Sequence, residues 1–117
     1  MRIWNFGIIG TGLIADIHAQ AIQSLVNANL AGVCSSDLAN ANTFAKKYNC
    51  KAFANYAEML ESSEIDIVTI ATPSGNHMEP ALEAAKRGKH VLCEKPIEIS
   101  LERIDKMIAA HKNAGTY

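Results

Sequence analysis

The chain has 117 residues, enough for one domain with a single core and too few for two. Hydrophobic residues make up 49% and charged residues 20%, a composition that is typical of globular proteins and argues against disorder or a fibrous repeat. The net charge of −1 provides no overall field for nucleic acid or an anionic membrane, so neither is expected as a partner.

Apolar runs alternate with segments of helical period, which predicts βαβ units and a parallel sheet. Strands are predicted over residues 2–10, 29–35, 50–56 and 65–73, and a fifth strand with its exit turn is predicted over residues 89–96. Helices are predicted over residues 13–25, 38–48, 57–63, 79–88 and 100–115. Right-handed crossovers place these strands in one Rossmann-type, doubly wound α/β sheet with helices on both faces. A further strand is expected after Gly115, so the sheet is expected to be incomplete at its C-terminal end.

The stretch "GIIGTGLIADIH" carries a GxGxxA pattern between a predicted strand and a predicted helix. Gly10 permits the tight turn, Gly12 lets the backbone approach a pyrophosphate, and Ala15 allows close packing of helix on strand. The pattern is short, and a generic strand-to-helix turn is the alternative. In this context it predicts a dinucleotide site on the helix N-terminus. The residues of the loop expected to bind the cofactor are Gly10, Thr11, Gly12, Leu13 and Ile14.

The second strand is followed by Ser35, Ser36 and Asp37, where a dinucleotide fold that prefers NAD carries an acid for the ribose 2′-hydroxyl. Ser35 stands at that position, and a small hydroxyl side chain leaves room for the 2′-phosphate of NADP. Neither serine is the Arg that usually pairs with this phosphate. The alternative role for Asp37 is to cap the following helix. All three residues are cofactor candidates, and the choice between NAD and NADP leans slightly to NADP.

The fourth and fifth predicted strands end in "ATPSGNH" and "CEKP". Ligands of open α/β sheets bind outside the carboxyl ends of the strands. The residues expected to face that edge are Ala71, Thr72, Pro73, Asn76, His77, Glu94 and Lys95. Lys95 could donate a proton or a hydrogen bond to a substrate oxygen there. A solvated loop lysine beside a glutamate is the alternative.

The segments "GIIGTGLIA" and "ATPSGNHMEPALEAAKRGKHVLCEKP" make the chain resemble the glucose-fructose oxidoreductase / inositol dehydrogenase (Gfo/Idh/MocA) family of NAD(P)-dependent oxidoreductases. The resemblance covers essentially the whole chain. It implies that Lys95 is a catalytic or substrate-orienting residue beside the nicotinamide, and that Glu94 and Pro96 shape the turn against the cofactor. The positions that match the loop near the ribose and nicotinamide are Thr72, Pro73, Asn76 and His77.

Members of that family continue into a second α/β domain, which supplies the substrate pocket, much of the dimer interface and usually an Asp and a His that act with the Lys. Residues 1–117 are therefore expected to be a truncated NAD(P)-binding domain, inactive alone and prone to self-association. The parent enzyme is expected to be a homo-oligomer that transfers hydride between nicotinamide and a secondary alcohol or ketone of a sugar, polyol or related compound. His18, His90 and His111 are expected to be structural or exposed rather than to replace the missing His.

Two other functions remain open at this point. A non-catalytic, nucleotide-sensing Rossmann module would need no Lys at the hydride-transfer position. A methyltransferase that binds S-adenosylmethionine at the glycine loop would have no use for "CEKP" after the fifth strand.

The cysteines and the apolar runs indicate where in the cell the protein is located. Cys34, Cys50 and Cys93 are odd in number and lack a CxxC motif, which fits reduced thiols better than disulfides or a zinc site, so no metal is expected. No uninterrupted apolar run approaches the roughly 20 residues that a membrane span requires. A cytoplasmic location is expected.

Overall fold

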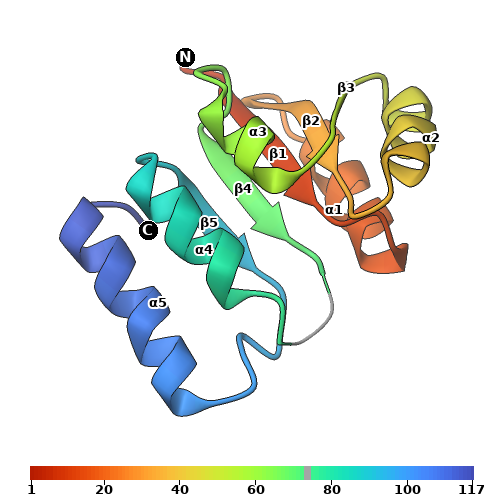
Figure 1. Cartoon of the computed structure of the whole chain (residues 1–117). Helices are drawn as coiled ribbons and strands as arrows, with labels where there is room; N and C mark the ends of the chain where they lie inside the picture. The colour runs from red at the N-terminus through yellow and green to blue at the C-terminus, as the bar shows by residue number, and fades with distance from the viewer. Residues whose placement is uncertain (73–74) are drawn as a thin grey trace.

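The computed structural model describes residues 1–72 and 75–117, so the predicted site residue Pro73 lies outside the described residues. Strands and helices alternate along the chain (Figure 1). The strands are β1 (Trp4–Ile9), β2 (Ala28–Cys34), β3 (Lys51–Phe53), β4 (Ile67–Ile70) and β5 (His90–Cys93). The helices are α1 (Leu13–Gln23), α2 (Leu38–Tyr48), α3 (Tyr56–Glu61), α4 (Met78–Lys86) and α5 (Leu101–Ala114).

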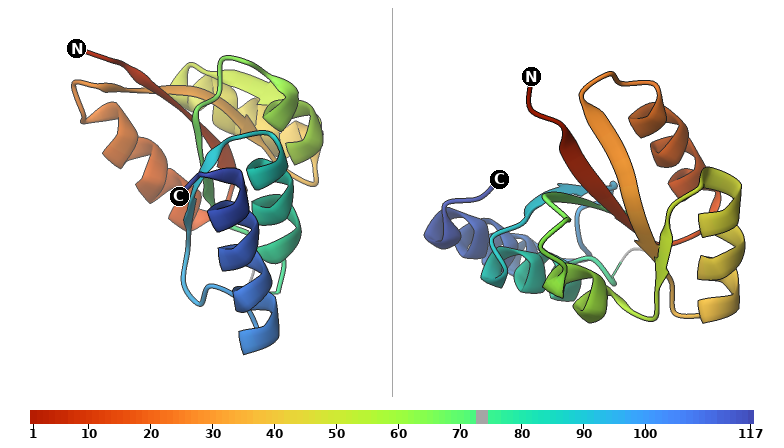
Figure 2. Two further views of the ribbon diagram at one scale, coloured as in Figure 1. Left: turned by 90° about the vertical axis from the view of Figure 1, so that its left-hand side faces the viewer. Right: turned by 90° about the horizontal axis from the view of Figure 1, so that it is seen from above.

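The five strands form one parallel sheet in the order β3-β2-β1-β4-β5. Figure 2 shows α1 and α2 on one face and α3, α4 and α5 on the other. The chain therefore winds outward from β1 in both directions, which confirms the predicted doubly wound Rossmann-type sheet. Its topological switch point lies between β1 and β4.

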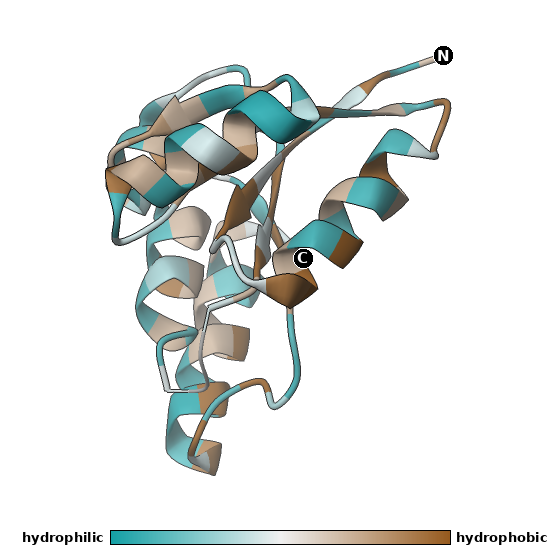
Figure 3. Ribbon diagram, turned by 90° about the vertical axis from the view of Figure 1, so that its right-hand side faces the viewer, coloured by the Kyte–Doolittle hydropathy of each residue, from teal (hydrophilic) through white to brown (hydrophobic). Residues whose placement is uncertain are grey.

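Two apolar clusters hold the layers together, one on each face of the sheet. Ile8 and Val33 pack with Ala15 and Phe44 beneath α1 and α2. The other cluster contains Val68, Met59 and further side chains from α3, α4 and α5. Figure 3 shows apolar strands between helices that carry hydrophilic residues. Since the strands are apolar on both faces, both are buried against helices, as expected for a parallel sheet.

Side-chain caps explain where several helices begin. Asp37 accepts a hydrogen bond from the Ala39 N–H at the start of α2, which confirms its capping role. Asn55 caps α3 by accepting from the Glu58 N–H. The predicted third strand over 50–56 is correspondingly shorter, because the cap at Asn55 ends the extended chain and starts the helix.

No helix within the described ranges combines the length and the apolar character needed to cross a bilayer.

Candidate cofactor and active site

The carboxyl ends of four strands meet at one edge of the sheet. Ile9 at the end of β1 lies beside Cys34 of β2 and Ile70 of β4. Ile70 in turn lies beside Cys93 of β5. The residues that follow these strand ends therefore emerge at one level: Gly10, Ser35, Ala71 and Glu94. Because open α/β sheets bind ligands outside this edge, the predicted site loops share one location in the fold.

Gly10 and Gly12 differ in their surroundings. Gly10 has φ +117°, and a Cβ built there would lie 2.8 Å from the Ala71 carbonyl oxygen, so a side chain is excluded. A Cβ built on Gly12 would meet no atom within 4 Å. The space above Gly12 is open to a ligand, which fits the close approach of a pyrophosphate. Ala15 is fully buried in the sheet-to-helix contact, as expected.

The start of α1 lacks a side-chain cap. Gly12 is its N-cap residue and offers no side chain to the first N–H groups. Those groups have no intrahelical acceptor, so they are available to an anion. Leu13 and Ile14 next to them are 77% and 39% exposed, which leaves apolar surface beside the glycine loop. This arrangement fits a dinucleotide phosphate with apolar contacts at its side.

Ser35 lies directly beside the glycine loop. The Thr11 hydroxyl donates to Ser35 Oγ at 3.4 Å, and the Asp37 N–H donates to the same oxygen at 3.3 Å. Ser36 and Asp37 are exposed. The Asp37 carboxylate already holds the Ala39 N–H, whereas Ser35 is in hydrogen-bond contact with the loop through Thr11.

The loop after β4 is tied to the turn after β5 by His77. His77 is 1% exposed; its ring Nδ1 lies 2.9 Å from the Ile97 carbonyl oxygen and its Nε2 lies 2.6 Å from the Thr72 carbonyl oxygen. The Thr72 hydroxyl donates to the carbonyl oxygen of Asn76 at 3.2 Å. Asn76 is exposed, whereas His77 is turned into the protein. His77 therefore positions backbone, and Thr72 and Asn76 are the more accessible members of this loop.

The turn at Lys95 is fixed through its neighbour. The Glu94 N–H donates to the Ile70 carbonyl oxygen at 3.0 Å, and the Lys95 N–H donates to Glu94 Oε1 at 3.2 Å. The Lys95 side chain is exposed. Within the described residues its ammonium group has no hydrogen-bond or ion-pair partner, which leaves its three donors to a ligand.

Glu98 was missed at the sequence level, and it organises the same turn. Its side chain is fully buried, and it accepts hydrogen bonds from the N–H groups of His77, Met78 and Ile99. The Arg103 guanidinium lies 3.4 Å from it. Burial of the carboxylate is the largest single influence on the pKa of Glu98, and it raises the pKa. The backbone hydrogen bonds and Arg103 together outweigh this effect, so the pKa of Glu98 lies below its usual value. Glu98 thus caps α4 from a distant part of the chain.

His18 was expected to be structural or exposed, and the structure places it at the site. Its Nε2 lies 2.9 Å from Glu94 Oε2. This hydrogen bond is the main reason why the pKa of Glu94 is lowered. The only sequence signal for the contact is that His18 lies on the helix that follows the glycine loop. By contrast, the ring of His111 binds Thr116 and Ala81 away from this edge, which agrees with a structural role.

The thiol of Cys93 lies at the end of β5. Burial raises the pKa of the Cys93 thiol to about 11, so it is no thiolate near neutral pH. All three cysteines are free. Across residues 1–72 and 75–117, no three potential ligands gather to hold a metal ion.

Comparisons with known proteins agree with this geometry. A family model described as "Oxidoreductase family, NAD-binding Rossmann fold" matches residues 4–117. Glucose-6-phosphate 3-dehydrogenase of Bacillus subtilis is 47% identical over 98 residues, which cover 84% of this chain and 27% of that protein. The scyllo-inositol 2-dehydrogenase (NADP(+)) of the same organism is 38% identical over 112 residues, which cover 95% of this chain and 34% of that protein.

A solved structure shows the same fold. The WlbA dehydrogenase from Bordetella pertussis, in complex with NADH and UDP-GlcNAcA, matches with a TM-score of 0.94 and 32% identity, covering 99% of this chain and 35% of that one. The chain thus spans about a third of the length of the relatives it matches. By its sequence from residue 4 to 117 and by its fold, the chain belongs to the Gfo/Idh/MocA family of oxidoreductases, which has an NAD-binding Rossmann fold.

Proposed function

We propose that residues 1–117 form the cofactor-binding domain of an enzyme that transfers hydride between a nicotinamide dinucleotide and a secondary alcohol or ketone of a sugar, polyol or related compound. The observation that carries this proposal is the strand register, which brings the glycine loop, Thr72 and the turn at Lys95 to one edge of the sheet. Two relatives are named for glucose 6-phosphate and scyllo-inositol, both of which carry several secondary hydroxyls. The substrate pocket is proposed to lie outside this chain.

Each end of the cofactor has candidate residues. The first N–H groups of α1 above Gly12 would hold the pyrophosphate, with Thr11, Leu13 and Ile14 around it. The serines and Asp37 after β2 would face the adenosine ribose. The nicotinamide half would lie toward β4 and β5, near Ala71, Thr72, residues 75–77 and the turn at Glu94. When bound, the nicotinamide supplies the hydride acceptor or donor.

Lys95 is proposed to act on the substrate oxygen. Its ammonium group can donate a hydrogen bond to the hydroxyl or carbonyl oxygen and so stabilise the negative charge that develops there during hydride transfer. Groups from outside residues 1–117 would share the proton transfer. The chain's own contribution is therefore to bind the dinucleotide and to orient and polarise the reacting oxygen.

The test of this function is a titration of NAD⁺, NADP⁺ and their reduced forms into the protein that carries the chain. Sugars and polyols are then screened for a change of absorbance at the nicotinamide band. Saturable binding and substrate-dependent reduction of the cofactor are expected. Absence of cofactor binding would contradict the proposal.

We further propose a slight preference for NADP, because Ser35 replaces the acid that binds the ribose of NAD. Ser35→Asp would repel a 2′-phosphate and accept hydrogen bonds from the ribose hydroxyls. The ratio of NADP to NAD affinity is expected to fall by about tenfold, which equals about 1.4 kcal/mol. Fluorescence titration with both cofactors measures it. Asn42→Asp adds the same charge on α2 and serves as control; an unchanged ratio in Ser35→Asp would count against the assignment.

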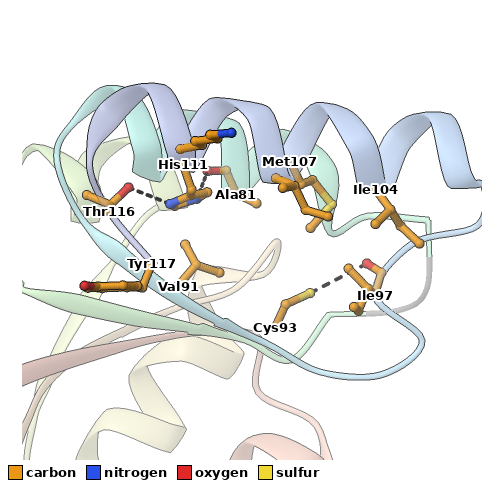
Figure 4. Close-up of a pocket in the computed structure, with 11 residues that line it drawn as sticks. Ala81, Val91, Cys93, Ile97, Ile104, Met107, His111, Thr116 and Tyr117 are labelled. Atoms are coloured by element: carbon orange, nitrogen blue, oxygen red, sulfur yellow. Dashed lines mark hydrogen bonds between the residues drawn. The ribbon is translucent and has the colours of Figure 1, made fainter.

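We also propose that the enzyme is a cytoplasmic homo-oligomer, in keeping with its free cysteines. Val91 and Cys93 of β5 and Ile104 and Met107 of α5 line an apolar pocket of about 360 Å³ (Figure 4). On the opposite face of β5, Leu92 is 57% exposed. Exposed apolar surface at an edge strand such as β5 favours association between molecules. Residues 1–117 alone are therefore expected to show an apparent mass that rises with protein concentration in light scattering. A monomer at every concentration is the contrary outcome.

A further inference from the structure

His18 and Glu94 form a contact that joins two distant parts of the chain. His18 lies on α1, and Glu94, which directly follows β5, is 76 positions further along the chain. The His18 and Glu94 side chains are only 14% and 29% exposed, so water screens this contact less than it screens the surface ion pairs, which contribute little. An ionised carboxylate only accepts hydrogen bonds, so Nε2 is the donor.

The other ring nitrogen of His18, Nδ1, is buried. Within the part of the chain that the structure describes, buried Nδ1 has no hydrogen-bond partner. His18 therefore acts on its polar surroundings through Glu94.

The two oxygens of Glu94 have different partners. Oε2 faces His18, and Oε1 accepts the N–H of Lys95. The backbone N–H of Glu94 is held by Ile70 of β4. The Glu94 carboxylate thus links the His18 ring on α1 to the backbone N–H of Lys95. A displacement of this carboxylate would be transmitted to the backbone of Lys95.

We propose that His18 is a positioning residue for Lys95, which it orients by holding the carboxylate of Glu94. The inference rests on the proposed function, in which Lys95 polarises the substrate oxygen. His18 also ties the turn at Lys95 to the helix whose N-terminus would hold the cofactor's phosphates. The hydrogen bonds through Glu94 therefore set Lys95 relative to the bound cofactor.

The first test observes this geometry without catalysis, in protein labelled with ¹⁵N-lysine. His18→Leu removes the donor, whereas His18→Gln keeps an N–H at a similar reach. The amide signal of Lys95 is expected to shift, and its hydrogen exchange to accelerate, in His18→Leu but not in His18→Gln. A Lys95 amide unchanged by His18→Leu would overturn the proposal.

The second test uses turnover. In the protein that carries the chain, His18→Leu is expected to lower kcat by about tenfold through a small misplacement of Lys95, with the KM for cofactor unchanged and the His18→Gln variant close to wild type. In a Lys95→Ala background, His18→Leu should cause no further loss. Equal losses in both backgrounds would show that His18 does not act through Lys95. If Lys95→Ala itself leaves kcat unchanged, the proposed function fails, and the amide measurement still decides the role of His18.

Discussion

Lys95→Ala is expected to lower kcat by about 10²- to 10⁴-fold while cofactor affinity stays nearly constant. The physical reason is that the ammonium group would donate to an oxygen whose negative charge grows in the transition state. The same group is exposed and makes no polar contact within the described residues, so its removal should cost little stability. Steady-state rates with the substrate found in the screen, together with a cofactor titration, measure both quantities.

Two variants control for this result. Lys95→Met keeps the aliphatic bulk and removes the charge, so it should be as slow as Lys95→Ala if the charge matters. Lys86 on α4 has a 74% exposed side chain and a long contact of 3.8 Å to Glu83, and Lys86→Ala should leave kcat unchanged. A Lys95→Ala protein with full activity would favour the nucleotide-sensing alternative over hydride transfer.

Gly12→Ser is expected to weaken cofactor binding by about 100-fold, or about 2.7 kcal/mol, without harming the fold. A Cβ at Gly12 meets no atom within 4 Å, and serine is a good N-cap residue. The new side chain would instead fill the space above the loop, and its hydroxyl would accept from the N–H groups that a pyrophosphate needs. Thermal unfolding without cofactor should show an equal or slightly higher Tm, while calorimetric titration shows the weaker binding.

Two further glycine variants extend this test. Gly12→Asp is also a good cap, but its charge repels the phosphates, so it should bind cofactor less well than Gly12→Ser. Gly10→Ala should instead lower the Tm, because its φ of +117° and the contact with Ala71 disfavour any side chain; strain of this kind costs about 1–3 kcal/mol. Normal cofactor affinity in both Gly12 variants would mean that the phosphates bind elsewhere.

The fold could be predicted well because its determinants are local. The alternation of apolar strands with periodic helices follows directly from the order of residues. Helix caps are also local: Asp37 accepts a hydrogen bond from an N–H group only two residues away. The predictions that were wrong concern the positions at which strands and helices end. The fourth strand was predicted to continue to Pro73, whereas β4 ends at Ile70 and Pro73 is outside the described residues. The pairing of β4 with β1 and β5 ends at Ile70, and the chain leaves the sheet there.

The site was only partly accessible from sequence. The glycine loop and Lys95 were recognisable because each belongs to a short motif. The contacts between His18 and Glu94 and between Glu98 and His77 join residues 76 and 21 positions apart, and only the folded sheet brings them together. Arg103 is a further example, because its side chain reaches both Glu79 and Glu98.

The buried carboxylate of Glu98 has a consequence for the thermodynamics of ligand binding. Three backbone N–H groups and one guanidinium hold it, so the segment that follows the turn at Lys95 is tied to the start of α4 by the chain's own groups. A dinucleotide that docks against such a preorganised surface loses little conformational entropy of the protein on that side. The free energy of its contacts there is then available for affinity and for holding the reacting atoms in line.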